Sequence, residues 1–134
     1  MSTKVMTCVC FAAVLSGGIF LAGTAITGTA NEWMISVDEQ VNGTPGNGLT
    51  TFICLKPGFD RLPEKVTGPQ CAGQSFQRTP DRLSWTLSCG GLSGEGQLTF
   101  SGDGKTMQGD VRVVKGGQTI TRHIEGDIED QCSM

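Results

Sequence analysis

The stretch that decides the fold runs from Cys71 to Cys89 and reads CAGQSFQRTPDRLSWTLSC. Two short runs with strand-forming residues, 74–79 and 83–89, flank a turn at Thr79-Pro80-Asp81, and this order predicts a β-hairpin. If the hairpin turns at Pro80, the numbers of directly opposed residues sum to about 160. Cys71 and Cys89 satisfy that sum, and their α-carbons then lie at a bridgeable distance. The hairpin therefore predicts a disulfide between them.

This register places the two aromatic residues of the hairpin on opposite faces. It places Trp85 on the face of the cysteines and sends Phe76 to the other face, unless the register shifts by one near the turn. Four cysteines follow the N-terminal region, and they allow three pairings between which the sequence alone does not choose. With Cys71 and Cys89 joined, Cys54 and Cys132 form the second predicted disulfide.

The remaining chain reads as further short strands between glycine-rich turns. Helical periodicity is confined to 57–66, where Gly58 and Pro63 limit it to about one turn. The dipeptide Gly116-Gly117 suits a two-residue hairpin turn, and 42–48 is expected to be a loop. We expect an all-β antiparallel meander of about seven strands, forming a barrel or a sandwich. The other strands are expected at 33–38, 49–55, 96–101, 106–114 and 118–128.

The N-terminus has the three parts of a secretory signal peptide. Lys4 precedes an apolar stretch at 5–22, and small residues follow up to Ala30. We expect residues 1–30 to be the signal peptide, with cleavage after Ala30 and with Ala25 as second choice. The alternative is an uncleaved anchor, because about 18 apolar residues can just span a bilayer. Cys8 and Cys10 would leave with the signal.

Residues 31–134 then form one small disulfide-stabilised domain in an oxidising compartment, and we expect it in the periplasm. Without Lys4 the domain keeps nine basic and thirteen acidic residues, a net charge of −4. That balance argues against binding to nucleic acid, which needs a basic face. No stable membrane insertion is expected once the signal is cleaved.

Several runs in this domain resemble the domain-of-unknown-function family 3617. The resemblance implies a small exported bacterial protein, typically periplasmic, and it implies no activity because the family is uncharacterised. The most specific run is the tryptophan strand that ends in Cys89-Gly90-Gly91. The runs that carry the resemblance are 32–37, 53–55, the Cys71 hairpin, 83–91, 94–96, 98–102 and the terminal Cys132.

This domain shows few of the residue patterns that are typical of enzymes or metal sites. No C-x-x-C occurs in the domain and His123 is its only imidazole, so we expect no metal site and no cofactor. His123 is expected on an outward face, solvated or paired with a charge. Carboxylates suited to glycoside hydrolysis occur along the last strand, but a charged solvent face explains them more simply. They are Glu125, Asp127, Glu129 and Asp130.

Arg122 is the outlier among the charged residues. It shares a predicted strand face with Ile120 and Ile124, so its charge must be paired, reach water or face a cavity. In a barrel mouth it could bind the head group of an otherwise apolar ligand. The simpler interpretation is that it reaches Asp127, Asp110 or water.

We expect a non-catalytic periplasmic binding module for a small apolar or amphipathic ligand. The alternative is an envelope protein that binds a partner, or has a structural role, through an open sheet face or edge. A hydrolytic enzyme is a distant third. The residues expected to line a ligand pocket are Trp33, Trp85, Phe100, Ile120, Arg122 and Ile124.

Overall fold

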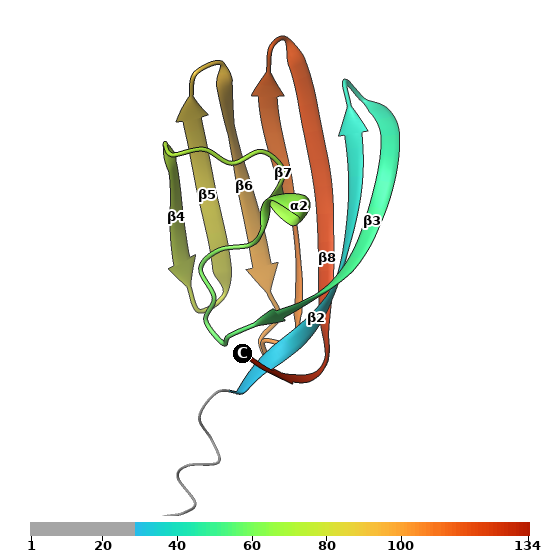
Figure 1. Ribbon diagram of the computed structural model, residues 1–134, viewed down its shortest axis with the longest axis vertical. Helices are drawn as coiled ribbons and strands as arrows, with labels where there is room; N and C mark the ends of the chain where they lie inside the picture. The colour runs from blue at the N-terminus through green and yellow to red at the C-terminus, as the bar shows by residue number, and fades with distance from the viewer. Residues whose placement is uncertain (1–28) are drawn as a thin grey trace, which may run out of the picture.

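Seven antiparallel strands form a single sheet in the computed structural model, which describes residues 29–134. The order across the sheet is β3-β2-β8-β7-β6-β5-β4, with a short helix, α2 (Glu64–Thr67), lying beside it (Figure 1). The strands are β2 (Thr29–Val41), β3 (Thr44–Leu55), β4 (Gln74–Thr79), β5 (Arg82–Cys89), β6 (Leu92–Phe100), β7 (Thr106–Lys115) and β8 (Gln118–Ser133).

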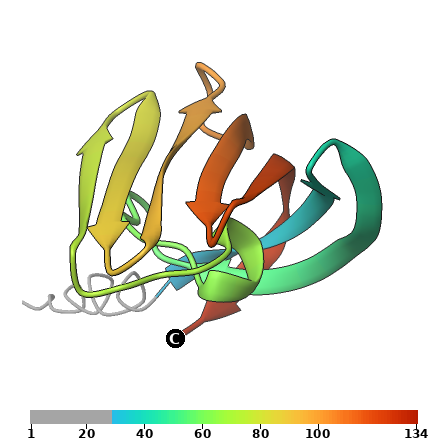
Figure 2. The ribbon, with the colours of Figure 1, turned by 90° about the horizontal axis from the view of Figure 1, so that it is seen from above.

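The all-β class, the seven strands and the small helical content are confirmed, but the barrel or sandwich is wrong. The edge strands β3 and β4 stand at opposite ends of the sheet order, so the sheet does not close. They are nevertheless consecutive in the chain, because 56–73 crosses one whole face of the sheet between them (Figures 1 and 2). The N-terminal hairpin β2–β3 completes the sheet by pairing with the C-terminal strand β8.

Two-residue turns join most neighbouring strands. At Gly116-Gly117 both φ angles are positive, 56° and 84°, and the predicted hairpin turn is present. The prediction of a loop at 42–48 is wrong. Asn42-Gly43, with φ of 52° and 81°, is itself a two-residue turn of this kind, and β3 begins directly after it at Thr44. An Asn-Gly pair tolerates positive φ at both positions, which matches the twist of the flanking strands.

One face of the sheet is covered by the crossing segment 56–73, and we call it the covered face. Along β2, β5, β6 and β7 the buried side chains of this face alternate with more exposed ones on the opposite, outer face. Leu62 and Val66 of the segment pack onto it. The helix predicted within 57–66 is confined to α2 and ends at Gly68, where φ is 90°. The strand residues of this core are Trp33, Ile35, Val37, Leu83, Trp85, Leu87, Leu98, Phe100, Met107, Val111, Val113 and Ile124.

Both predicted disulfides are present, although the register behind one of them is not. In the β4–β5 hairpin the opposed numbers sum to 161, as in the pair Phe76 and Trp85. The register is thus shifted by one, because Pro80-Asp81 forms a two-residue turn, and both aromatic rings lie on the covered face. Cys71 precedes β4 and still reaches Cys89, with the α-carbons 6.5 Å apart.

The second disulfide joins Cys54 of β3 to Cys132 of β8, with the α-carbons 6.0 Å apart. These are the strands on either side of β2. Two disulfides agree with an oxidising, exported location. None of the helices within 29–134 has the length and apolarity needed to cross a membrane.

The predicted signal peptide lies almost entirely outside the described residues, which begin at Thr29. Thr29 and Ala30, placed within it by the expected cleavage, belong to β2. They pair with Ser133 and Cys132 of β8, and Ala30 is only 2% exposed. Cleavage after Ala30 would therefore remove two paired residues of the sheet.

Candidate functional site

The face expected to hold a ligand is filled by the protein's own side chains. Trp33 and Phe100 each meet the ring of Phe59 edge-on, with centroids 6.0 and 5.6 Å apart. Because Phe59 comes from the crossing segment 56–73, that segment occupies the place where an apolar ligand was expected. The six predicted pocket residues all lie on the covered face, and four of them are buried: Trp33, Trp85, Phe100 and Ile124.

Arg122 is bound within the fold. Its Nε and Nη2 atoms donate to Oε2 of Glu39 at 2.8 and 2.7 Å. Its Nη1 atom donates to the backbone carbonyls of Lys65 and Val66 at 3.1 and 3.2 Å. The guanidinium of Arg122 therefore links α2 to β2 and β8, and most of the Arg122 side chain is shielded from water. A carboxylate or phosphate ligand would have to displace Glu39 to reach it.

The partner of Arg122 differs from those expected. Asp110 and Asp127 project from the outer face, whereas Arg122 projects from the covered face, so neither carboxylate can meet it. Glu39 lies directly opposite Arg122 in the β2–β8 register and provides the ion pair. The sequence showed the need for a partner but not its identity, because 83 positions separate the two residues.

A hollow lies on the outer face of the sheet. It has a volume of about 600 Å³ and extends across five strands, β4 to β8. We call it the outer groove. Trp85, Gly96 and Val111 contribute to its floor, and all its other lining residues are polar. These polar residues are Ser75, Gln77, Ser84, Thr86, Glu95, Gln97, Asp110, Arg112 and Thr121.

The register of the strands arranges these polar side chains in two rows across the groove. In one row Glu95, Arg112 and Thr121 follow one another on β6, β7 and β8. In the other row Gln97 is opposed to Asp110. Within 29–134 the guanidinium of Arg112 forms no ion pair or hydrogen bond with another residue. Its five N–H donors are thus free for a ligand.

Glycines in β6 and β7 permit close packing beneath the groove. A side chain at Gly96 would collide with the indole ring of Trp85, which lies against the β6 backbone on the covered face. A side chain at Gly109 would collide with the carbonyl of Gln97. Glycine permits such close approach and the strong local coiling that accompanies it. The β6 backbone therefore lies directly against the Trp85 ring beneath the groove.

His123 stands at the margin of the outer groove between two carboxylates. Its Nδ1 atom lies 3.0 Å from Asp110 and its Nε2 atom 2.9 Å from Glu125. The hydrogen bond to Asp110, followed by that to Glu125, raises the pKa of His123 above its ordinary value of 6.5. This is the outward, charge-paired histidine that the sequence predicts.

No protein-family model, curated protein or solved structure matches this chain. The resemblance to family 3617 therefore stays a prediction. No group of three or more potential metal ligands is placed within 29–134 so that it could hold an ion.

The residues of the outer groove were missed by the sequence analysis. Their signal was present as serine, threonine and glutamine at alternate positions in neighbouring strands, such as Ser84 and Thr86. The sequence alone gave no reason to assign those positions a role. Only the register, which places them beside Gln97 and Arg112, shows that they gather in one hollow.

Proposed function

We propose that this protein is a non-catalytic periplasmic binding module that takes an uncharged, hydroxyl-rich ligand of the saccharide class in the outer groove. The observation that carries the proposal is the outer groove itself: a hollow of about 600 Å³ lined by nine polar side chains from five strands. The opposite, apolar face is covered by 56–73, whose Leu62 and Val66 belong to the core.

The chemistry of the lining supports this ligand class. Each sugar hydroxyl donates one hydrogen bond and accepts others, and serine, threonine and glutamine side chains do both. Glu95 and Asp110 add acceptors, and Arg112 adds donors. Charges of both signs are interspersed, so the groove attracts neither a polyanion nor a polycation strongly.

The disulfides and the predicted export signal support the proposed periplasmic location. Two disulfides persist in a compartment that keeps thiols oxidised, and the bacterial periplasm is such a compartment. A ligand with many hydroxyl groups fits that compartment, because envelope polysaccharides and imported sugars both pass through it.

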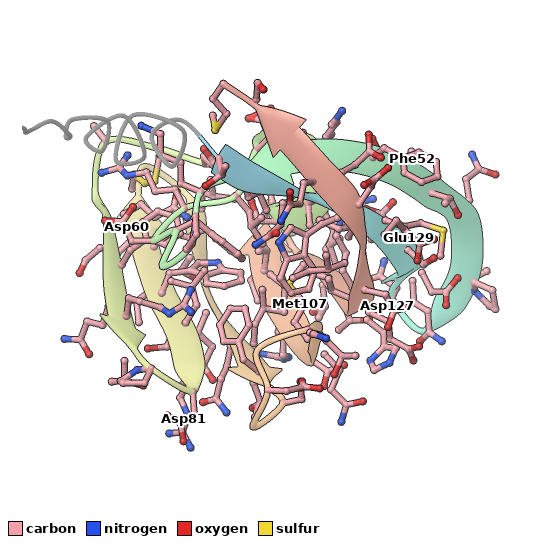
Figure 3. All side chains as sticks on the ribbon, turned by 90° about the horizontal axis from the view of Figure 1, so that it is seen from below. Phe52, Asp60, Asp81, Met107, Asp127 and Glu129 are labelled. Carbon is pink, nitrogen blue, oxygen red and sulfur yellow. A yellow bond between two sulfur atoms is a disulfide. The ribbon has the colours of Figure 1, made fainter. Side chains whose placement is uncertain are left out.

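Three other functions stay predictions. An apolar or amphipathic ligand has less support than a saccharide, because the six residues expected to line its pocket face the crossing segment or the core. A partner-binding role through an open edge is supported by Phe52, which is 57% exposed on β3 (Figure 3). Hydrolysis by the carboxylates of β8 is the third, and these carboxylates follow one another along a single strand.

A titration of the ¹⁵N-labelled protein with neutral oligosaccharides tests the proposal. We expect the amide signals of β5, β6 and β7 to shift on addition of a panel of gluco-, malto- and chito-oligosaccharides. Gln97→Ala and Arg112→Ala should weaken binding about tenfold each, because each removes hydrogen bonds to the ligand. Gln118→Ala is the matched control, since this amide lies at the start of β8, outside the groove.

The same spectra separate the rival functions. Shifts confined to Ile120, Ile124 and the segment 56–73 on addition of a fatty acid would show an apolar ligand on the covered face and contradict the proposal. Equal affinity in Gln97→Ala, Arg112→Ala and the control would also contradict it.

A further inference from the structure

The two open edges of the sheet differ in how well they are protected. β4 has six residues, four of them polar besides the charged Arg78. β3 has twelve residues and no charge, and its second half reads Leu49-Thr-Thr-Phe-Ile-Cys-Leu55. Proteins usually protect such an edge with charges or prolines, because its unpaired N–H and C=O groups can pair with another strand. Here the one proline, Pro45, stands at the hairpin end and leaves 49–55 open.

Exposed apolar side chains mark the same segment. Phe52 is 57% exposed and Leu49 38%, and Met134 is the only other large apolar side chain so exposed within the described residues. Figure 3 shows Phe52 at the margin of the sheet on β3, far from Met107 in the core. An uncharged edge strand with exposed apolar side chains is what a strand-pairing interface requires.

The segment is also nearly symmetric about Phe52. One position away on either side stand the β-branched residues Thr51 and Ile53, and two positions away the small residues Thr50 and Cys54. Leucine occupies both outer positions, 49 and 55. An antiparallel copy centred on Phe52 would therefore place residues of similar size opposite one another along the whole segment.

Charge complementarity extends this register beyond the strand. In the same alignment Lys56 of one copy lies opposite Gly48 of the other, since these positions are equidistant from Phe52. The space above Gly48 is bordered by the carboxylate of Asp38, whose Oδ1 atom would lie 3.4 Å from a Cβ there. Neither Lys56 nor Asp38 has an ion-pair partner within 29–134. Because the dimer has twofold symmetry, the contact between Lys56 and Asp38 would occur twice.

We infer that β3 is a dimerisation edge, at which two copies of this chain pair antiparallel about Phe52 to form one continuous sheet. The interface is isologous, so the assembly closes at two copies. The axis runs through the sheet, so the two outer grooves open on the same side. The inference does not depend on the groove binding a saccharide, but a ligand with repeated units would engage both grooves at once.

Sedimentation velocity of the full chain, purified with both disulfides formed, tests the inference. We expect a monomer–dimer equilibrium with a dissociation constant between about 1 and 100 µM, as suits an interface formed mainly by one strand. Phe52→Lys should weaken it at least about tenfold, because the two lysines would face each other across the axis. Ser75→Lys, which puts the same charge on the β4 edge, should leave it unchanged.

Charge reversal tests the register itself. Lys56→Glu or Asp38→Lys alone should weaken the dimer about three- to tenfold, and the double variant should restore it. A monomer at every concentration, larger oligomers, or weakening by Ser75→Lys but not by Phe52→Lys would overturn the inference. A double variant no tighter than the single variants would overturn the register centred on Phe52.

Discussion

Two charged residues next to each other on β8 have opposite roles. Arg122 points to the covered face and fastens α2 to the sheet, whereas His123 points outward between two carboxylates. The alternation of a strand decides this division. The outward position of His123 was predictable from that alternation alone. The partner of Arg122 was not, because Glu39 meets it only through the pairing of β2 with β8.

Arg122→Ala should destabilise the protein by about 2–4 kcal/mol. The substitution leaves Glu39 without its cation in a partly buried site, and it leaves two carbonyls of α2 without a donor. Urea unfolding followed by tryptophan fluorescence measures the change. Arg112→Ala is the control, and its exposed guanidinium should change stability by no more than about 0.5 kcal/mol. Equal losses in the two variants would contradict the structural role of Arg122.

His123, the only histidine of the chain, should titrate above pH 6.5. Asp110→Asn should lower this pKa more than Glu125→Gln, because Asp110 is the larger cause of the shift. Nuclear magnetic resonance of the imidazole ring measures the pKa of His123 in the parent protein and in both variants. A pKa at or below 6.5 in the parent protein would contradict the two hydrogen bonds.

The same shift links stability to pH. The folded-state pKa of His123 is raised above its unfolded value, so the stabilisation is fully present below about pH 6.5 and is lost as the pH rises through the folded-state pKa. The stability advantage of the parent protein over His123→Gln should therefore shrink as the pH rises above about 6.5. Urea unfolding at several pH values measures it. An advantage that grows with pH would reverse the sign and contradict this account.

At the scale of elements, the crossing segment 56–73 decides which face of the sheet is available. The sequence indicated one short helical turn there, but not that the segment lies across the sheet. Its apolar residues Phe59, Leu62 and Val66 bury themselves against strands distant in the chain. Local patterns do not encode such contacts, so the closed face and the open groove could not be predicted.

Leu62→Ala should destabilise the protein by about 2–4 kcal/mol, because it removes a buried side chain that packs on the sheet and leaves a cavity. Lys65→Ala, on the same segment, should have little effect, since only its backbone carbonyl contacts Arg122. Denaturant unfolding measures both. Hydrogen exchange should also quicken in β4 and β5 of Leu62→Ala, and unchanged exchange there would show that the segment does not cover the sheet.

At the scale of the whole molecule, the disulfides fasten the ends of an open sheet. Cys54 and Cys132 enclose 78 positions of sequence separation, and Cys71 and Cys89 only 18. On a chain-entropy basis they contribute about 4.5 and about 3 kcal/mol. Replacing Cys54 and Cys132 with serine should thus lower the melting temperature more than replacing Cys71 and Cys89. Calorimetry of the two double variants compares them, and the reverse order would contradict this assignment.

The architecture also changes the expected start of the processed chain. Thr29 and Ala30 pair with the end of β8, so a cut after Ala30 would shorten β2 at a buried position. We propose that cleavage follows Ala25, the second choice of the sequence analysis. Intact mass of exported protein should show a chain that begins at Ile26. A chain beginning at Asn31 would support the original expectation instead.

The sequence by itself determined the β class and the approximate strands. It led to the cysteine pairs through a hairpin register that differs by one position from the structure. Strand alternation and turn residues act over short stretches and leave local marks such as Gly116-Gly117. The tertiary structure decided that the sheet stays open, that Arg122 is used internally and that a polar groove forms on the outer face. These outcomes depend on which distant strands pair and which face 56–73 covers, because burial of apolar surface is shared by segments that no local pattern connects.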